Sequence, residues 1–350
     1  MNDMTPILVR FMLDRDALTP PPEDKNIHMR FLKAWESYGI LLDIDTKNGS
    51  SRIKNTIDTM HVRFRKYWET ALIKHLRDFI PPSLPELESI DKVENLRDFS
   101  GKTHLLCLED VKADLLAIEA GLNDYDGFFQ PKNLTVEITR LKDIDICSAF
   151  ERARSCTQQI IPKGVSVNDV WRNNFLPLVD MHKNIFILDA YAMEEHWRSI
   201  LNTFSQQSGL QKMVREIGAH KMGHSLKLFT SSNSQMKHQD IVDMLKDMLD
   251  RFNRGGIKSL KVGSIDERSF ANVHHERHVV FDLKRVCTLG KGLTILSGEN
   301  LKQNLHLSFS TETEDVKVLK RLKETFESKF ESESQPLAIL STVFDSWGNT

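Results

Sequence analysis

The chain has 350 residues, of which 40% are hydrophobic and 27% are charged. This length and composition fit two domains with ordinary cores and exclude a disordered or fibrous protein. The 47 Lys and Arg residues are balanced by 49 Asp and Glu residues, which gives a formal net charge of -2. No global field therefore favours nucleic acid or an anionic membrane, and binding to either needs a local patch.

Cysteine usage and apolar runs indicate the compartment. The four cysteines form no C-x2-C pair, which argues against a structural zinc site and a disulfide framework. The first residues lack a basic segment followed by an apolar core, and no segment offers about 18 uninterrupted apolar residues. We expect a cytoplasmic protein without a transmembrane segment.

Strand-like and helix-like patterns alternate along the first 125 residues. The sequence predicts strands over 7–13, 40–44 and 103–108, and helices over 25–38, 51–79 and 111–121. We expect a smaller N-terminal α/β domain over 1–125. Its role is not assigned by any motif, and contact with a protein partner is the hypothesis for it.

Carboxylates follow two of these strands. Asp14 and Asp16 end the first strand, while Glu109, Asp110 and Asp114 follow the strand over 103–108. PIN-like nucleases hold Mg²⁺ or Mn²⁺ with oxygen ligands at such strand ends. The more common explanation is that acids at helix N-termini are favoured by the helix dipole. We therefore expect no cofactor, and a Mg²⁺ or Mn²⁺ site at Asp14, Asp16 and Asp110 is the alternative.

The predicted helix over 51–79 is basic. Seven Lys or Arg residues lie between Arg52 and Asp78, and aromatic residues are interleaved with them. Such a face can contact nucleic-acid phosphates, with Arg63, Lys66 and Lys74 as candidates. A solvated surface helix with its aromatic residues toward the core is the more common reading of this pattern.

Beyond residue 134, predicted strands and helices alternate over a longer stretch of the chain. It predicts strands over 135–141, 184–189, 225–230 and 257–262, and helices over 145–159, 167–179, 239–252 and 315–330. Helices of this length between strands indicate βα units and a mostly parallel sheet. We expect a second domain over 134–330 and a tail over 331–350.

One motif in this second domain contains candidate binding or catalytic residues. His275, Arg277, Asp282, Gly290 and Gly292 form the spacing His-x-Arg-x4-Asp-x7-Gly-x-Gly. His-x-Arg occurs at four other places in the chain, but only this copy is followed by the Asp and the glycine pair. Its surroundings predict a β-hairpin.

The run HERHVVFDLKRVCTLGKGL resembles the signature of the MIT C-terminal domain family, which has a phospholipase D-like fold. Leu293 also matches that signature, and Lys291 stands where the family usually has Arg. Upstream, Asp189-Ala190-Tyr191 is similar to the family's Asp-Pro-Tyr, although the proline is missing. The resemblance implies a phospholipase D-like mixed, mostly parallel sheet flanked by helices over roughly 134–330.

Family membership would carry further expectations. The domain is regarded as catalytically degenerate and as a binder of membranes or partners, and prokaryotic chains that contain it often belong to antiviral defence or mobile-element clusters. Nothing before residue 134 resembles the three-helix MIT bundle, so the partners of eukaryotic relatives are not transferred to this chain.

The motif residues suggest binding of a phosphodiester. Arg277 can hold a phosphate bidentately, with His275, Lys291, Gly290 and Gly292 around it. The ligand would be nucleic acid or a phospholipid headgroup. Because Arg is flatter and bulkier than Lys, it would displace the phosphate relative to His275, and a misplacement of about 1 Å can cost roughly 100-fold in rate. We therefore expect binding without turnover.

Two alternatives stay open. In active phospholipase D-like enzymes one His attacks phosphorus and a carboxylate orients its ring, roles that His275 and Asp282 could fill. Since the chain has no second copy of the motif, such a metal-independent nuclease or phosphodiesterase would need a homodimer. The other alternative is that His275, Arg277 and Asp282 are a hydrogen-bonded remnant kept for folding.

Overall fold

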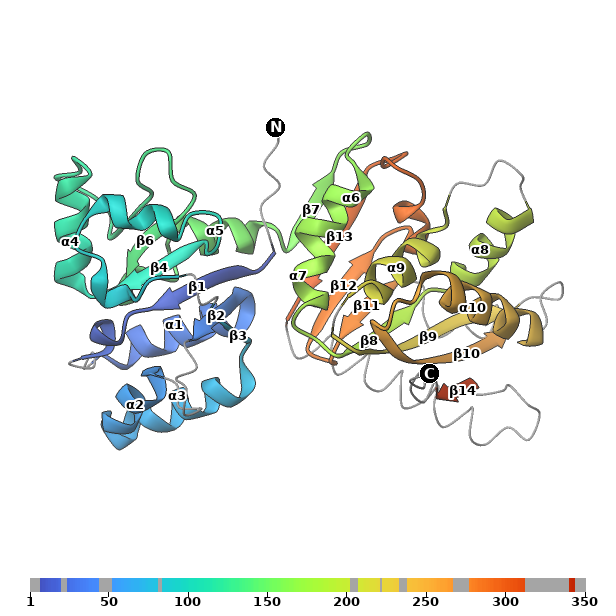
Figure 1. The fold of residues 1–350 in the computed structure, drawn as a ribbon, viewed down its shortest axis with the longest axis horizontal. Coiled ribbons are helices and arrows are strands. Elements are labelled where there is room, and N and C mark those ends of the chain that lie inside the picture. Colours follow the sequence, from blue (N-terminus) through green and yellow to red (C-terminus); the bar gives the residue numbers. More distant parts are fainter. Residues whose placement is uncertain are drawn as a thin grey trace. The chain divides into compact units, whose positions relative to one another are not determined.

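The computed structural model describes residues 7–19, 24–43, 52–80, 84–201, 207–220, 222–232, 238–266, 277–311 and 340–343. It divides into two compact units, one formed by Thr5–Ser155 and the other containing Cys156–Thr350 (Figure 1). Both are mixtures of helices and strands. The four cysteines are buried and free. Among the described helices, none is both long and apolar enough to cross a membrane.

The first unit is built on a six-stranded sheet in the order β3-β2-β1-β4-β6-β5. Its strands are β1 (Val9–Leu13), β2 (Gly39–Asp43), β3 (Arg77–Phe79), β4 (Leu105–Leu108), β5 (Phe128–Phe129) and β6 (Glu137–Arg140). All pairings are parallel except that of β5 with β6. Since the chain adds strands first on one side of β1 and then on the other, the sheet is doubly wound, with a switch point between β1 and β4.

Helices cover both faces of this sheet. One core joins the sheet to α1 (Lys25–Tyr38), α2 (Arg52–Thr59), α3 (Val62–Lys74) and α5 (Ser148–Ser155), and the other joins it to α4 (Asp110–Glu119) (Figure 1). Alternate residues of β1 serve the two cores: Phe11 packs on the first and Met12 on the second. Both faces are therefore buried, as a parallel sheet requires.

Two sequence predictions for this unit were wrong in detail. The helix expected over 51–79 is broken into α2 and α3 at Met60, which is buried, and at His61, whose side chain caps α3 by accepting from the Arg63 N–H. Strand β3 then takes the last residues of the expected helix.

The expected start of the second domain at residue 134 also differs from the division of the structure. Strand β6 pairs in parallel with β4 of the first sheet. The buried Glu137 on β6 accepts two hydrogen bonds of 2.7 Å from the Ser148 and Ala149 N–H groups, which attaches the start of α5 to the first unit. The βα alternation simply continues through this region, so the sequence pattern does not mark the division at residue 155.

The second unit contains an eight-stranded sheet in the order β14-β10-β9-β8-β11-β12-β13-β7. Its strands are β7 (Gln158–Ile161), β8 (Asn184–Leu188), β9 (His224–Ser232), β10 (Ile257–Asp266), β11 (His278–Phe281), β12 (Arg285–Leu289), β13 (Leu305–Ser310) and β14 (Leu340–Val343). Only β8, β9 and β10 run parallel to one another; the other pairings among the described strands are antiparallel.

The sheet is therefore mixed, as expected, but it is not mostly parallel. A short turn between Phe281 and Arg285 joins β11 to β12 and leaves no room for a crossover helix, and the antiparallel neighbours in this half of the sheet need none. The helix expected over 145–159 ends at Ser155, and β7 follows it. The helix predicted over 315–330 lies outside the described residues.

The helical segments of this unit are α6 (Val167–Val170), the π-helical turn η5 (Trp171–Phe175), α7 (Leu176–Val179), α8 (Ala192–Leu201), α9 (Gly209–Gly218), α10 (His238–Phe252) and the 3-10 segment η6 (Gly292–Leu296). Gly209 lets α9 approach η6, because a Cβ at that position would lie 1.7 Å from the Leu293 carbonyl oxygen. This packing fixes the segment that follows β12 over the carboxyl end of β8.

Candidate functional site

Asp189 is the centre of a polar cluster at the carboxyl end of β8. Its backbone N–H continues the sheet by donating to the Phe229 carbonyl of β9. Its carboxylate accepts from the Tyr191 N–H at 3.0 Å and from the Leu293 N–H at 2.7 Å. Only 2% of Asp189 is exposed. Burial raises the pKa of this carboxyl, and the two N–H donors and Arg277 oppose the shift.

Arg277 lies beside Asp189, directly before β11. Its Nη1 donates to the Gly290 carbonyl at 3.0 Å, its guanidinium lies 5.2 Å from the centre of the Tyr191 ring, and its Nε is 3.9 Å from Asp189 Oδ1. A quarter of the side chain is exposed. The ring and the carbonyl therefore fix the orientation of a cation that solvent still reaches.

The two glycines of the motif have different roles here. Gly292 has a φ of +70°, and a Cβ on it would lie 2.3 Å from Asp189 Oδ2 and 2.5 Å from Arg277 Cδ. Only glycine fits this position. At Gly290 a Cβ would meet nothing closer than 3.6 Å, so this residue contributes its carbonyl rather than its lack of a side chain.

A second carboxyl, Glu195 on α8, lies near Asp189. Burial raises its pKa, with a further contribution from the charge of Asp189, while a hydrogen bond with the Thr294 side chain opposes the shift. Its Oε2 is buried and has no hydrogen-bond partner among the described residues. Burial therefore disfavours the charged form of both Asp189 and Glu195.

The other motif residues are not gathered at this cluster. Asp282 follows β11, at the opposite end of that strand from Arg277, or roughly 16 Å away at about 3.3 Å per residue. Its carboxylate accepts from the Asn184 N–H at 2.8 Å and the Asn184 side-chain amide at 2.7 Å. It joins the start of β8 to the β11–β12 turn, where its own φ is +48°.

Asp282 therefore has a structural position, and the structure does not bring it to Arg277 as a catalytic set would require. Lys291 points elsewhere too, with its Nζ 2.8 Å from the Gln303 side-chain oxygen. His275 lies outside the described residues. What the structure brings together are Asp189, Tyr191, Arg277 and the main chain of 290–293.

In the first unit, the predicted acids follow β1 and β4, and each of them pairs with a different cation. Asp14 is buried, and its Oδ2 is 3.0 Å from Lys112 Nζ, while Asp110 is 2.9 Å from Lys142 Nζ. Asp16 lies 3.7 Å from Arg15. No group of three His, Cys, Asp or Glu side chains suited to a metal occurs in the described part of the chain. Asp14 and Asp110 are thus each neutralised by a lysine in this structure.

The remaining acids have other partners as well. Glu109 caps α4 by accepting from the Lys112 N–H, and Asp114 accepts from the Tyr125 hydroxyl. Both contacts lie within the first unit and use the oxygens that a cation would need. The helix-dipole explanation of these acids fits Glu109 directly.

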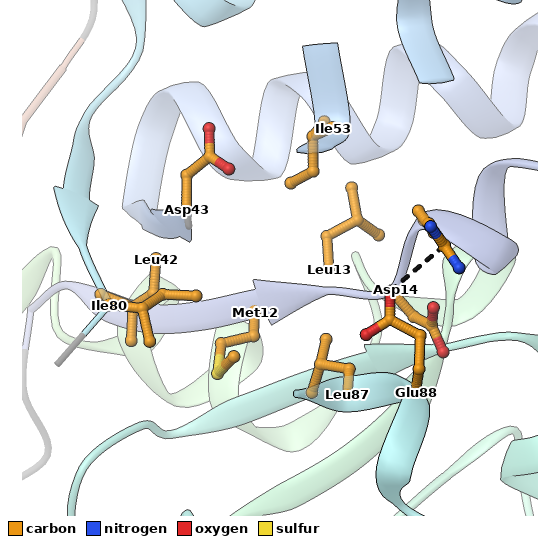
Figure 2. A pocket seen from close by; sticks show the side chains of 10 residues that line it. Met12, Leu13, Asp14, Leu42, Asp43, Ile53, Ile80, Leu87 and Glu88 are labelled. Carbon is orange, nitrogen blue, oxygen red and sulfur yellow. Dashed lines mark ion pairs between the residues drawn. The ribbon is translucent and has the colours of Figure 1, made fainter. Parts of the chain in front are cut away.

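Figure 2 shows a small cavity beside Asp14, at the carboxyl ends of β1 and β2. Apolar side chains such as Met12, Leu42 and Ile80 form much of its wall, and an ion pair of 3.2 Å between Arg15 and Glu88 lies at its edge. Its volume of about 30 Å³ has room for a water molecule or two at roughly 10–15 Å³ each. A nucleotide does not fit.

The three candidate nucleic-acid contacts share the solvent side of α3. Arg63, Lys66 and Lys74 are all exposed, while Phe64 and Trp68 are buried in the core. Phe64 and Trp68 therefore face inward, as the common reading of this helix predicted, whereas Tyr67 is 40% exposed. Lys66 also borders a groove of about 320 Å³ between α1 and α3, beside the half-exposed Tyr67.

Helix α4 presents an apolar stripe to solvent. Val111, Leu115 and Ile118 follow one another at helical spacing, and about 60% of each is exposed: 61%, 62% and 60%, respectively. Exposed apolar stripes of this kind are typical of protein contact surfaces.

Several residues of the second unit's cluster carried no sequence signal. Glu195 and Gly209 match no motif, and they become significant only through contacts with the segment after β12, about a hundred residues later. Comparison with protein-family models finds no matching family, and no curated protein sequence matches the chain.

Proposed function

We propose that the second unit binds a phosphodiester of nucleic acid at Arg277 without cleaving it. The supporting observation is the state of the guanidinium: it is oriented by Tyr191 and Gly290, is a quarter exposed, and makes one hydrogen bond to the described residues. A guanidinium has five N–H donors. The others can therefore hold phosphate oxygens, as a fixed planar fork does well.

The same geometry supports binding over turnover. A reaction at phosphorus needs a nucleophile and an orienting carboxylate within hydrogen-bond reach of one another. Asp282, the carboxylate that the motif offers, is bound to Asn184 at the far end of β11.

The direct test is fluorescence anisotropy with labelled single- and double-stranded DNA and RNA over a range of salt concentrations. We expect Arg277→Gln to weaken binding roughly tenfold or more and to lower the salt slope by about one unit. Arg277→Lys should be intermediate, because it keeps the charge and loses the fork. Arg172→Gln is the matched control, since Arg172 is an exposed arginine of the same unit paired with Asp169.

Three results would overturn the proposal. Equal binding by wild type and Arg277→Gln would exclude the site. Binding to anionic vesicles instead of nucleic acid would replace the ligand with a phospholipid headgroup. Cleavage in EDTA that His275→Ala abolishes would make the second unit an enzyme, and a dimer in solution would then be expected, because one chain supplies one copy of the motif.

A second candidate function rests on the doubly wound first unit. Its sheet places Asp14 and Asp110 after adjacent strands on the two sides of the switch point, where ligands of such folds bind. Metal-dependent cleavage there requires Mg²⁺ or Mn²⁺ to displace Lys112 from Asp14. It would be abolished by EDTA and by Asp110→Asn and would be unaffected by Arg277→Gln.

A further inference from the structure

Three histidines meet at the amino ends of β8 and β9. His182 precedes β8, His220 follows α9, and His224 is the first residue of β9. Asp189 lies at the other end of β8, so this cluster is separate from the Arg277 site. Its two facing ring nitrogens, His220 Nδ1 and His224 Nε2, are 3.3 Å apart.

The contacts of His224 define where its hydrogen lies. Its Nδ1 is 3.1 Å from the carbonyl oxygen of His182. A carbonyl can only accept, so Nδ1 carries the hydrogen and Nε2 keeps its lone pair when the ring is neutral. His224 is also fully buried.

His220 has the complementary arrangement. Its Nε2 is 2.5 Å from Asp180 Oδ1, and its Nδ1 accepts from the Met222 N–H at 3.3 Å. The hydrogen therefore lies on Nε2, toward the carboxylate, and the lone pair lies on Nδ1. His220 Nδ1 and His224 Nε2 flank the gap, and a cation bound there would take the single Nδ1 lone pair from its long contact with the Met222 N–H.

We infer that His220 Nδ1 and His224 Nε2 bind a transition-metal ion of the Zn²⁺ type. Zinc–imidazole bonds of about 2.0–2.1 Å at a tetrahedral angle separate two ligand nitrogens by about 3.3–3.4 Å, which matches the observed gap. Neutral imidazole suits zinc, copper and nickel rather than the hard cation Mg²⁺.

The surroundings provide the second shell that such ions usually have. Each ligand ring donates its other N–H to an oxygen, His220 to the Asp180 carboxylate and His224 to the His182 carbonyl, which fixes tautomer and ring orientation.

The rest of the coordination sphere is open. The described residues add no third His, Cys, Asp or Glu ligand, so water completes it from the side of His220, which is 23% exposed. The nearby His182 is excluded as a ligand, because its Nε2 faces the guanidinium of Arg285 at 3.2 Å.

The test is zinc binding by the full chain after removal of metal with EDTA, measured by competition with a chromophoric chelator. Wild type should bind one equivalent at this site and gain thermal stability with zinc. His220→Gln should lose both effects, and Asp180→Asn should weaken binding about tenfold. His306→Gln, which changes an exposed histidine of the same unit, should have no effect. Cobalt in place of zinc should give the visible spectrum of a tetrahedral site with nitrogen ligands.

His220→Gln is preferred to a His224 variant because His224 is in the core, and a circular dichroism spectrum would confirm that the variant folds. Zinc binding that is unchanged in His220→Gln, or absent from wild type, would overturn the inference. So would nitrogen NMR showing, in the presence of zinc, a proton rather than a metal shared by the two rings. Arg277→Gln should bind zinc normally, so this test can fail independently of the proposed nucleic-acid site.

Discussion

Asp14 in the first unit and Asp189 in the second are two buried aspartates in equivalent positions, each directly after a central strand of its sheet. Only 1% of Asp14 and 2% of Asp189 are exposed. Asp14 is paired at 3.0 Å with Lys112. Asp189 accepts from two backbone N–H groups, and its arginine is 3.9 Å away.

The difference concerns which group satisfies the buried charge. In the first unit Lys112 neutralises the buried carboxylate. Its Nζ also donates to the Leu87 carbonyl, and only 21% of its side chain is exposed. In the second unit two backbone N–H groups satisfy the Asp189 carboxylate, which leaves most of the Arg277 donors available. Equivalent positions therefore give a structural ion pair in one unit and a candidate binding site in the other.

The largest expected effect is that of Lys112→Met, which keeps the stem and removes the charge. Loss of one partner of a buried pair leaves the other uncompensated and typically costs 3–5 kcal/mol. Because Lys112 is partly exposed, we expect the free energy of unfolding of the first unit to fall by about 3 kcal/mol. Urea titration with hydrogen exchange of β1 amides would measure it.

The double variant Asp14→Asn, Lys112→Met is the control. It removes both charges, so it should be more stable than Lys112→Met alone. If Lys112→Met cost less than about 1 kcal/mol, the usual value of a surface pair, Lys112 would not be the structural partner of Asp14. The carboxylate would then be available to a metal ion.

Gly292→Ala and Gly290→Ala test the other half of the comparison. At Gly292 the Cβ would collide with Asp189 and Arg277, and φ is in the left-handed region. We expect a loss of about 2 kcal/mol in the second unit together with loss of nucleic-acid binding. Gly290→Ala has an ordinary contact of 3.6 Å and should change neither by much. Similar stabilities of the two variants would show that the glycine pair does not shape the Arg277 site.

The sequence predicted best the features that depend on neighbouring residues. The apolar runs at 7–13, 40–44, 103–108 and 184–189 correspond to β1, β2, β4 and β8. The break between α2 and α3 was missed, because residues that favour a helix continue through Met60 and His61. Only the burial of Met60 and the cap at His61, which are visible in the structure, mark the end of one helix and the start of the next.

Contacts between distant residues could not be predicted in the same way. Lys112 and Asp14 are 98 residues apart, and Asp189 and the Leu293 N–H are 104 apart. Strand direction in the second sheet also depends on such pairings, which is why its antiparallel half was missed. The sequence analysis used Asp189 only as a point of family resemblance and did not place it beside Arg277. It also assigned Asp282 to the Arg277 site, although Asp282 lies at the other end of β11.

The smallest expected effect is that of Glu195→Gln. Burial, and then the charge of Asp189, raise the pKa of Glu195 above its ordinary value of 4.5. The folded state thus binds this proton more readily than the unfolded state, so the second unit should gain stability as the pH falls from neutral toward 4.5. Glutamine carries no charge at any pH, so the variant should lose part of that gain.

At neutral pH the variant should be the more stable protein, because glutamine places no charge at this buried position. Denaturation curves at several pH values would measure the slope, with the exposed Glu299→Gln as the control. A steeper slope in Glu195→Gln than in wild type would mean that Glu195 is stabilised as a carboxylate. A second full negative charge would then lie near Asp189, the carboxylate beside Arg277, and an anion would bind there less readily than we propose.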